Sequence, residues 1–413
     1  RGFTIGGADI DVFVGYASAG FDRTRSFAEQ ADTLYGFGAE GIDFGLMQVK
    51  GGNGISYTAA KAHADTVALY GFNPDDFTLS ARGIDFKLNT ASFGPALNFL
   101  NSHPSTGGYE LPTGAEPVLL DFTGQTIGAS LNNATLRISE FVHVSGAFAF
   151  EKGGLRTLSA KTVGGLHVPV LAEGFTIGAS HVQAFVGVGG PYRDDSNGDG
   201  RITTADDIAN PDAIGLVVDD FSFGLALFRD KALGTRYTAL AADAANIGFN
   251  GFGEVIDFSL SDVRVGINQS SNPLFALDFT QLDGGALEIP TGDDPVRLDF
   301  DNARIEATVG HATAGVAGIV TLEGGFTFQK RTIDEIGFHG LGMNLTLGAD
   351  ALIVAGQNIQ AFAGIRGPYL TDSDRDGDFS DETPSDDAIG FAINDLDFAL
   401  AMVSPSLGGG LTL

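Results

Sequence analysis

Apolar and polar residues alternate with a period of two along almost the whole chain. The alternation is clearest at Phe221, Phe223, Leu225 and Leu227, and again at Val142, Val144, Phe148 and Phe150. Side chains two residues apart share one face of a strand, so the pattern predicts strands with one apolar and one polar face. Segments of roughly 6–10 residues recur between GG, NG and DG turn signals, which favours mostly antiparallel strands. The sequence therefore predicts an all-β fold.

Two short stretches suggest helices instead. They are AEQADTLYGFG (28–38) and AAKAHADTVALYG (59–71). The segment YTALAADAANIGF (237–249), which aligns with the second stretch, alternates more like a strand. We expect these two stretches to be minor features of an all-β chain.

The chain also resembles itself. GFTIGGADIDVFVG begins at position 2, GFTIGASHVQAFVG at 174 and ALIVAGQNIQAFAG at 351. YELPTGAEPVLLDF (from 109) matches LEIPTGDDPVRLDF (from 287), and ATLRISEFVHVSGAFAFEKG (from 134) matches the segment from 312. The order of the matches is constant and their offsets drift only slowly, which indicates tandem repeats of about 177 residues.

The offsets divide the chain into three copies. The first (1–154) lacks its front, the second (155–331) is complete, and the third (332–413) stops part-way. No Pro/Ser-rich or charged linker separates them, as independent beads would need. We therefore expect an elongated architecture, solenoid-like or with a continuous sheet, in which neighbouring copies share apolar surface. Because the chain opens at Arg1, inside a copy, we expect it to be part of a longer polypeptide.

The second copy carries an acidic loop (195–206) with the spacing D-x-N-x-D-G-x₅-D. Oxygen atoms at positions 1, 3 and 5 of such a loop converge on one hard cation, because Gly at position 6 permits the sharp turn. Oxygen-only ligands favour Ca²⁺ over Zn²⁺. The predicted ligands here are Asp195, Asn197, Asp199, the carbonyl of Arg201, and Asp206.

The third copy has a related loop (372–383) at the equivalent place. Position 12 is Thr383, so an acidic residue just before it must close the site. The predicted ligands are Asp372, Asp374, Asp376, Asp378 at position 7, and Asp381 or Glu382. The first copy has YASAGFDRTRSFAEQAD at this place and carries no predicted site.

Charge and cysteine content restrict the partners. Lys and Arg total 23 against 52 Asp and Glu, which gives a net charge of −29. Such a chain is expected to repel nucleic acid and anionic lipid head groups and to attract cations. The absence of cysteine excludes disulfides and thiolate metal sites. No apolar run approaches the ~18 residues of a transmembrane helix, so we expect no membrane-spanning helix.

Catalytic signatures are missing from the sequence. It has no GxSxG elbow and no cysteine nucleophile, and its seven histidines are scattered without an HxxxH pair. We therefore expect that the protein is not an enzyme.

The phrases AFVGVGG, DAIGLVVDDFSFGLALF, YTALAADA, VRLDF and GGFTFQK resemble those of giant repetitive bacterial surface proteins. The two acidic loops are similar to dockerin-type and EF-hand loops over about twelve residues each. The first resemblance implies a secreted, surface-attached structural or adhesive module. We expect a calcium-stabilised rod or filament whose partners are neighbouring repeats, identical subunits, or a cell-surface or carbohydrate ligand.

Two other interpretations stay open. An extracellular carbohydrate-active enzyme or carbohydrate-binding β module would place an acid/base or ligand-binding cluster in one copy only. An outer-membrane β-barrel also has strands of about ten alternating residues, but it requires aromatic girdles, and this chain has no Trp and only 8 Tyr.

Overall fold

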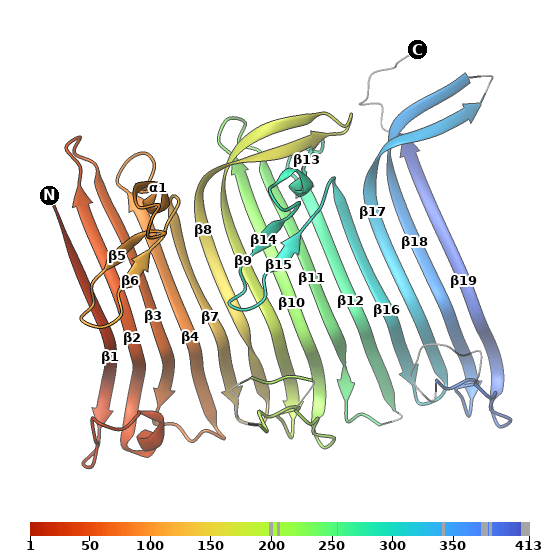
Figure 1. The fold of residues 1–413 in the computed structure, drawn as a ribbon. Coiled ribbons are helices and arrows are strands. Elements are labelled where there is room, and N and C mark those ends of the chain that lie inside the picture. Colours follow the sequence, from red (N-terminus) through yellow and green to blue (C-terminus); the bar gives the residue numbers. More distant parts are fainter. Residues whose placement is uncertain are drawn as a thin grey trace.

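A computed structural model describes residues 1–197, 201–204, 207–253, 255–340, 343–372, 379 and 382–405. Its main element is one fifteen-stranded sheet, in which consecutive long strands pair antiparallel from one end of the chain to the other (Figure 1). The predicted all-β, mostly antiparallel class is therefore confirmed. None of the described helices is long and apolar enough to cross a membrane.

The main sheet consists of β1 (Gly2–Ala17), β2 (Leu34–Lys50), β3 (Ser56–Tyr70), β4 (Phe77–Ala91), β7 (Thr126–Ile138), β8 (Val142–Thr162), β9 (His167–Val188), β10 (Ile214–Asp230), β11 (Arg236–Asn250), β12 (Ile256–Ser270), β16 (Arg304–Val316), β17 (Val320–Gly340), β18 (Met343–Ile365) and β19 (Ile389–Pro405), in that order. The short β13 (Phe275–Leu277) pairs with β8. Two insertions form hairpins, β5 (Tyr109–Leu111) with β6 (Val118–Leu120) and β14 (Leu287–Ile289) with β15 (Val296–Leu298). The described helices are η1 (Ala28–Thr33), α1 (Phe99–Ser102) and η2 (Phe279–Gln281).

Both helical expectations need correction. The stretch 28–38 is helical only over the six residues of η1, and Leu34 already begins β2. The stretch 59–71 is wrong as a helix, because residues 59–70 belong to β3. Its alanines favour a helix in isolation, but pairing with β2 and β4 on both sides satisfies the backbone as a strand.

The strands of the main sheet contain 13–23 residues, longer than the roughly 6–10 expected from the sequence. In most of them one residue in the interior of the strand adopts a left-handed conformation, with φ between 51° and 64°. These residues lie at the same height on the sheet, which we call the bulge level. The residues at this level are Asp9, Gly41, Gly83, His181, Asp220, Asp262, Asn358 and Asp395. Register shifts at this level mark β-bulges between β1 and β2, between β9 and β10, and between β18 and β19, whereas the register around Gly83 and Asp262 is unshifted. Each bulge shifts the alternation by one residue, and the sequence pattern therefore looked like two shorter strands.

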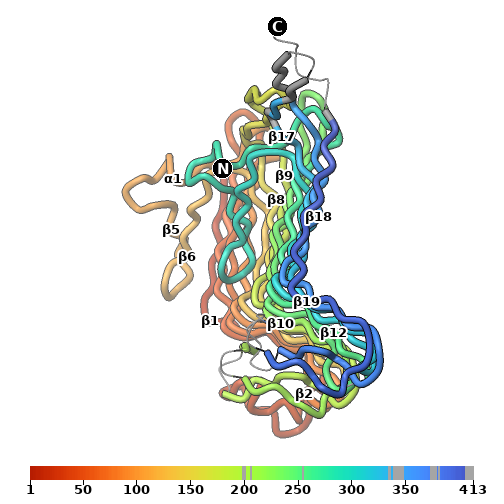
Figure 2. The backbone as a smooth tube through the Cα atoms, turned by 90° about the vertical axis from the view of Figure 1, so that its right-hand side faces the viewer, coloured from red at the N-terminus to blue at the C-terminus, as the bar shows by residue number. Residues whose placement is uncertain are grey.

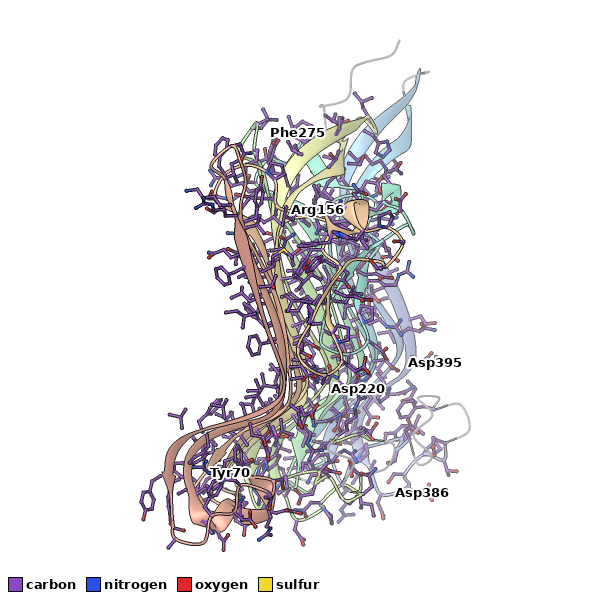
Figure 3. The ribbon with its side chains drawn as sticks, turned by 60° about the vertical axis from the view of Figure 1, so that its left-hand side comes forward. Tyr70, Arg156, Asp220, Phe275, Asp386 and Asp395 are labelled. Atoms are coloured by element: carbon purple, nitrogen blue, oxygen red, sulfur yellow. The ribbon has the colours of Figure 1, made fainter. Side chains whose placement is uncertain are left out.

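Side chains of neighbouring strands hold the bulges in place. The backbone N–H of Asp9 donates to Oδ1 of Asp43 at 2.9 Å, and that of Asn358 donates to Oδ1 of Asp397 at 2.9 Å. The N–H of His181 donates to the Ser222 hydroxyl at 3.2 Å. Since a bulge increases local twist and bends its strand, a row of bulges bends the whole sheet. Figure 2 shows this bend edge-on, and in Figure 3 Asp220 is labelled beside it.

The two faces of the bent sheet differ in character. The convex face carries the two hairpin insertions and most polar side chains, whereas the concave face carries almost only apolar side chains (Figure 3). Buried clusters lie on the convex face, beneath the insertions. One joins Phe228 and Tyr237 to Ile289 and Leu298, and a smaller one surrounds Leu111.

A buried asparagine ties each insertion to the sheet. Asn89 donates from Nδ2 to the carbonyls of Leu97 and Gly124, both at 2.7 Å. Asn268 donates in the same way to Leu277 at 2.7 Å and Asn302 at 2.8 Å. Both asparagines are fully buried.

Close backbone approach explains two glycines beneath the insertions. A Cβ atom on Gly6 would collide with the carbonyl oxygen of Pro112, and one on Gly178 would collide with that of Pro290. Each hairpin can therefore lie directly on the sheet backbone only where the strand has no side chain.

We predict that Asn268→Ala lowers the free energy of unfolding by about 2–4 kcal/mol. The substitution leaves two buried carbonyl groups without a donor, and each such group costs about 1–3 kcal/mol. Urea unfolding followed by circular dichroism measures the change. The control Asn101→Ala, at an exposed position, should change stability by less than about 0.5 kcal/mol. Equal effects of the two substitutions would contradict the assignment of Asn268 as the clamp, the buried side chain that ties the insertion to the sheet.

Candidate metal loops and the cavity beneath one of them

Three loops occupy corresponding places at the lower end of the sheet. Residues 18–33 connect β1 to β2, residues 189–213 connect β9 to β10, and residues 366–388 connect β18 to β19 (Figure 1). The two predicted calcium loops belong to the second and third of these connections. Each connection begins where an apolar strand leaves the sheet, so acidic residues can gather there in contact with solvent.

The structure describes part of each predicted ligand set. Asp195, Asn197 and Arg201 are described in the loop 189–213, and Asp372 and Glu382 in the loop 366–388. The other predicted ligands lie outside the described residues: Asp199, Asp206, Asp374, Asp376, Asp378 and Asp381. Within the described ranges, no three His, Asp or Glu side chains are grouped as metal ligands.

The side chain of Arg201 binds a carboxylate of the hairpin insertion and is not itself a predicted metal ligand. Its Nη1 lies 2.8 Å from Oδ2 of Asp293, which belongs to the turn between β14 and β15. The predicted ligand atom of Arg201 is its backbone carbonyl, so this ion pair is compatible with the prediction. It also connects the loop 189–213 to the hairpin insertion.

Asp207 organises the described part of this loop. Its carboxylate accepts from the N–H and the hydroxyl of Ser196, at 2.8 and 2.9 Å, and from the N–H of Thr203 at 2.9 Å. Burial alone would raise the pKa of Asp207, but these hydrogen bonds and nearby Arg193 favour the charged form and hold its pKa below the usual value. Sequence reasoning missed this residue because spacing alone favours its neighbour, Asp206.

Arg193 fixes the loop to the sheet. Its Nη1 donates to the carbonyl of Asp207 at 2.6 Å, and its Nε donates to Oδ1 of Asp219 on β10 at 3.2 Å. Asp219 is only 5% exposed, so the ion pair is shielded from water. The loop is therefore anchored at Arg193 and folded around Asp207.

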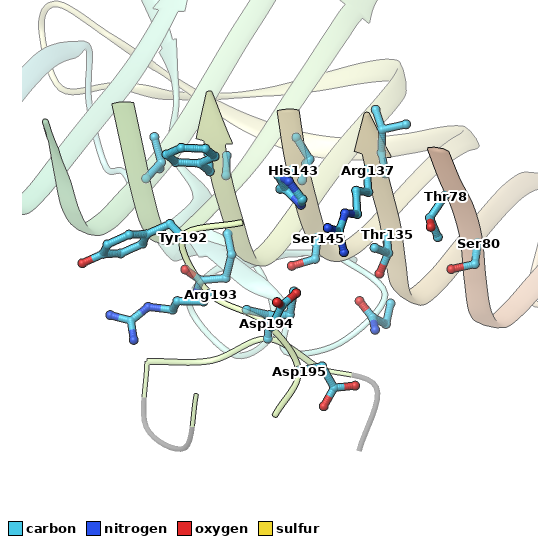
Figure 4. Close-up of a pocket in the computed structure, with 18 of the residues that line it drawn as sticks. Thr78, Ser80, Thr135, Arg137, His143, Ser145, Tyr192, Arg193, Asp194 and Asp195 are labelled. Atoms are coloured by element: carbon cyan, nitrogen blue, oxygen red, sulfur yellow. The ribbon is translucent and has the colours of Figure 1, made fainter. Parts of the chain in front are cut away.

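A cavity of about 250 Å³ lies between this loop and the convex face of β4, β7, β8 and β9 (Figure 4). Its sheet wall carries hydroxyl groups from Thr78, Ser80, Thr135 and Ser145, set among apolar residues of the same strands. Its loop wall includes Asp194, which Figure 4 shows facing the sheet.

Basic side chains also line the cavity. Arg82 forms no ion pair with any residue that the structure describes, and Arg137 lies 3.7 Å from the largely exposed carboxylate of Asp75. Nε2 of His143 is buried and has no hydrogen-bond partner there. Burial lowers the pKa of His143, Arg137 lowers it further, and Asp194 opposes the shift. Besides Arg193, which is held by Asp219 and the Asp207 carbonyl, the cavity offers two arginines and a neutral imidazole, and the carboxylates of Asp194 and Asp195 also line it. This mixed lining suits a hydroxyl-rich group.

The equivalent place beneath the loop 366–388 has the opposite charge. Glu323 on β17 aligns in the sequence with Ser145 on β8, and its neighbours include Asp257 and Asp372. Burial, reinforced by these two carboxylates, raises the pKa of Glu323 to about 7. Gln360, paired with Glu323 across the sheet, is 8% exposed, and its Oε1 has no partner in the described structure.

Two histidines pair with carboxylates near the bend. His63 Nδ1 lies 3.0 Å from Asp85, and His181 Nδ1 lies 2.8 Å from Asp220. Burial would lower the pKa of each histidine, but the adjacent carboxylates outweigh it and raise the pKa. Sequence inspection treated these histidines as isolated, because the partners lie 22 and 39 residues away.

Comparisons with known proteins identified no similar protein. No protein-family model matches the chain, and no curated protein and no solved structure matches it.

We predict that Glu323 makes stability fall as pH rises in calcium-free buffer. Its folded pKa lies above that of an exposed glutamate, so its contribution is complete below pH ~4.5 and is lost as pH rises to about 7. Allowing for solvent screening, the loss should be about 2 kcal/mol.

Unfolding in denaturant with chelator at pH 5 and pH 8 measures this slope. Glu323→Gln should reduce it by that amount, whereas Glu110→Gln, on the exposed side of β5, should keep the parent slope. A Glu323→Gln variant with the parent's pH dependence would refute the assignment.

Proposed function

We propose that this chain is a structural and adhesive module of a secreted, surface-attached protein, in which tandem repeats of about 177 residues lengthen one β-sheet into a rod. In this proposal the first copy spans 1–154, the second 155–331 and the third 332–413. Its partners are neighbouring repeats or identical subunits, and a cell-surface ligand. No catalytic step belongs to the proposal.

The observation that carries this proposal is the unbroken sheet across both repeat boundaries. Residues 330–331 lie within β17 and pair with both β16 and β18. Residues 153–154 lie within β8, where Gly153 pairs with Thr126, the N–H of Gly154 donates to the Gln125 carbonyl, and the pairing with β9 continues across a register shift between Lys152 and Leu155. A boundary inside a paired strand cannot act as a free hinge, because bending there would break backbone hydrogen bonds on both sides. The proposed repeats would therefore add strands to one sheet.

Equivalent contacts at aligned positions support the repeat. The clamps Asn89 on β4 and Asn268 on β12 align in the sequence, and each binds the two ends of its own insertion. The close contact of Gly6 with Pro112 recurs between Gly178 and Pro290. Chain segments with this much local correspondence are best explained as copies of one folding unit.

Calcium is the cofactor that we propose for the two acidic loops. Clustered carboxylates repel each other when no cation is bound, so an ion that binds only the folded loop stabilises it. The Arg193 and Asp207 contacts fix the part of the loop 189–213 that carries Asp195 and Asn197. The loop 18–33, without the Asx-Gly spacing, provides a control within the same molecule.

Hydrogen exchange of the full chain, with calcium and with chelator, tests both parts of the proposal. Calcium at a hundredfold excess over its dissociation constant should slow exchange in 189–213 by up to about a hundredfold and leave 18–33 unchanged. Asp195→Ala should remove the effect in 189–213 only.

Amides of β8 around 153–154 and of β17 around 330–331 should be protected like strand centres under both conditions. Rapid exchange at these boundaries would contradict a continuous sheet. A response to calcium that is equal in all three loops would contradict the metal assignment and leave the sheet assignment intact.

A further inference from the structure

The concave face of the sheet is apolar over its whole width. On every strand from β1 to β19 in the main order, the side chains on this face between the two rims are apolar or uncharged. Representative pairs are Gly7 with Phe44, Phe223 with Ala242, and Gly356 with Phe398. Thirteen strand spacings of about 4.8 Å give a width of about 60 Å, so the face covers roughly 2,000 Å² or more.

No described part of the chain covers this face. Its large apolar residues near the lower ends of the strands are between about a third and two thirds exposed, for example Leu216 at 37% and Val14 at 67%. Both insertions and the buried clusters lie on the convex side. Soluble monomers rarely expose a contiguous apolar patch above roughly 300–600 Å². The face therefore requires an occupant.

The shape of the face restricts that occupant. The row of bulges makes the apolar side the inner side of the bend, so the face forms a trough that runs across the strands (Figures 2 and 3). Two such concave sheets placed face to face would touch along their limbs and leave an empty apolar space between the bends. Because protein interiors are packed at high density, that arrangement is poor. Flexible hydrocarbon chains can fill a trough of this form.

The two rims of the trough differ in charge. At the lower rim, apolar side chains continue to the last residues of the strands, as at Tyr16, Ile214 and Val316. The upper rim carries five cationic side chains on the concave side: Lys50, Lys152, Arg229, Arg236 and Lys330. None of the five forms an ion pair within the described structure, although the chain has 29 more acidic than basic residues. Two acidic side chains share this rim. Glu173 is bound to Lys231 at 2.6 Å and also lies near Lys152 and Arg229, and Asp350 accepts from the Thr332 hydroxyl at 3.1 Å.

The positions of these cations recur along the trough. Lys152 on β8 aligns in the sequence with Lys330 on β17, and Lys50 on β2 aligns with Arg229 on β10. Arg229 and Arg236 are direct cross-strand partners, where like charges destabilise a sheet, and Glu173, opposite Arg229 on β9, offsets part of their repulsion. An anionic group bound at the rim would offset that repulsion.

We propose that the concave trough binds anionic phospholipid, with acyl chains along the apolar bend and the head-group phosphate at the rim formed by Lys50, Lys152, Arg229, Arg236 and Lys330. Uncharged hydrocarbon meets no charged group in the trough, so binding there has no desolvation penalty for ions. Each rim cation near the phosphate strengthens binding by about fivefold. This site goes beyond the scaffold role, and its failure would leave the continuous sheet and the calcium loops untouched.

Photocrosslinking of the purified full chain tests the site. The chain is incubated with phosphatidylglycerol vesicles that contain a trace of phosphatidylglycerol with a diazirine in one acyl chain, then separated from the vesicles and irradiated. Phosphatidylcholine vesicles with the corresponding probe provide the comparison. We expect retained lipid, crosslinks to concave-face residues such as Phe223 and Phe398, and more labelling by phosphatidylglycerol.

Two variants separate the parts of the site. Phe223→Glu places a charge in the trough and should lower labelling by both lipids about tenfold or more. The double variant Lys152→Glu/Arg229→Glu should lower labelling by phosphatidylglycerol about tenfold or more and change labelling by phosphatidylcholine little. The control Lys87→Glu, a single charge reversal on the convex face, should match the parent. Melting curves confirm that each variant is folded.

Several outcomes would overturn the proposal. The absence of retained lipid, or crosslinks only on the convex face and the loops, would rule out a lipid trough. A folded Lys152→Glu/Arg229→Glu variant with the parent's lipid preference would rule out the head-group rim. A dimer in light scattering, with the concave face protected from hydrogen exchange and no lipid bound, would assign the face to contact between copies of the chain.

Discussion

The architecture depends on keeping one side of every strand apolar while the sheet bends. In a strand without an extra residue, apolar and polar positions alternate unchanged from end to end. In these strands the apolar positions move from odd to even numbers, or the reverse, part-way along. In β1 the concave side chains are Phe3 and Ile5 before the bulge and Ile10 and Val12 after it, so odd positions give way to even ones. The left-handed residue Asp9 absorbs the change. Without it, half of each strand would turn its apolar side chains to the convex face.

The other features follow from this constraint. Because bulges lie at one level on neighbouring strands, their unpaired backbone groups sit beside each other, and side chains such as Asp43 and Asp397 bind them. The convex face is then free to carry polar groups, which accounts for the cavity, the His–carboxylate pairs and the acidic loops. Small local cores form there only where a hairpin covers the sheet, and Asn89 and Asn268 secure those hairpins.

Part of this could be predicted from the sequence, for physical reasons. Period-two alternation requires only the geometry of an extended chain, so the all-β antiparallel class was evident in stretches such as Phe221–Leu227. The bend was not evident, because the residue type does not show the backbone conformation. An Asp or His that adopts a left-handed conformation inside a strand cannot be told from one in an ordinary turn. Strand lengths were underestimated for that reason, and the stretch 59–71 was misjudged because alanine propensity does not show which strands lie beside it.

The candidate sites show the same limit. Loop spacing predicted a set of calcium ligands, but not the part of Asp207, which depends on contacts with Ser196 and Thr203. A net charge of −29 predicted repulsion of anionic head groups, but a sum of charges says nothing about where they lie. Cations gather at one rim of the concave face only once the strands are in register. The position of the charges, and not only their sum, therefore decides whether an anionic head group is an expected partner.

Distances between spin labels test the central claim, one bent sheet that advances by the same six strands in each proposed repeat. The chain has no cysteine, so Val14→Cys, Val186→Cys and Ala363→Cys, all at exposed positions of corresponding strands, can be labelled in pairs. Six strand spacings separate each neighbouring pair, which predicts two narrow and equal distances of about 29 Å and a third of about 58 Å. Broad distributions, or two unequal steps, would contradict the account.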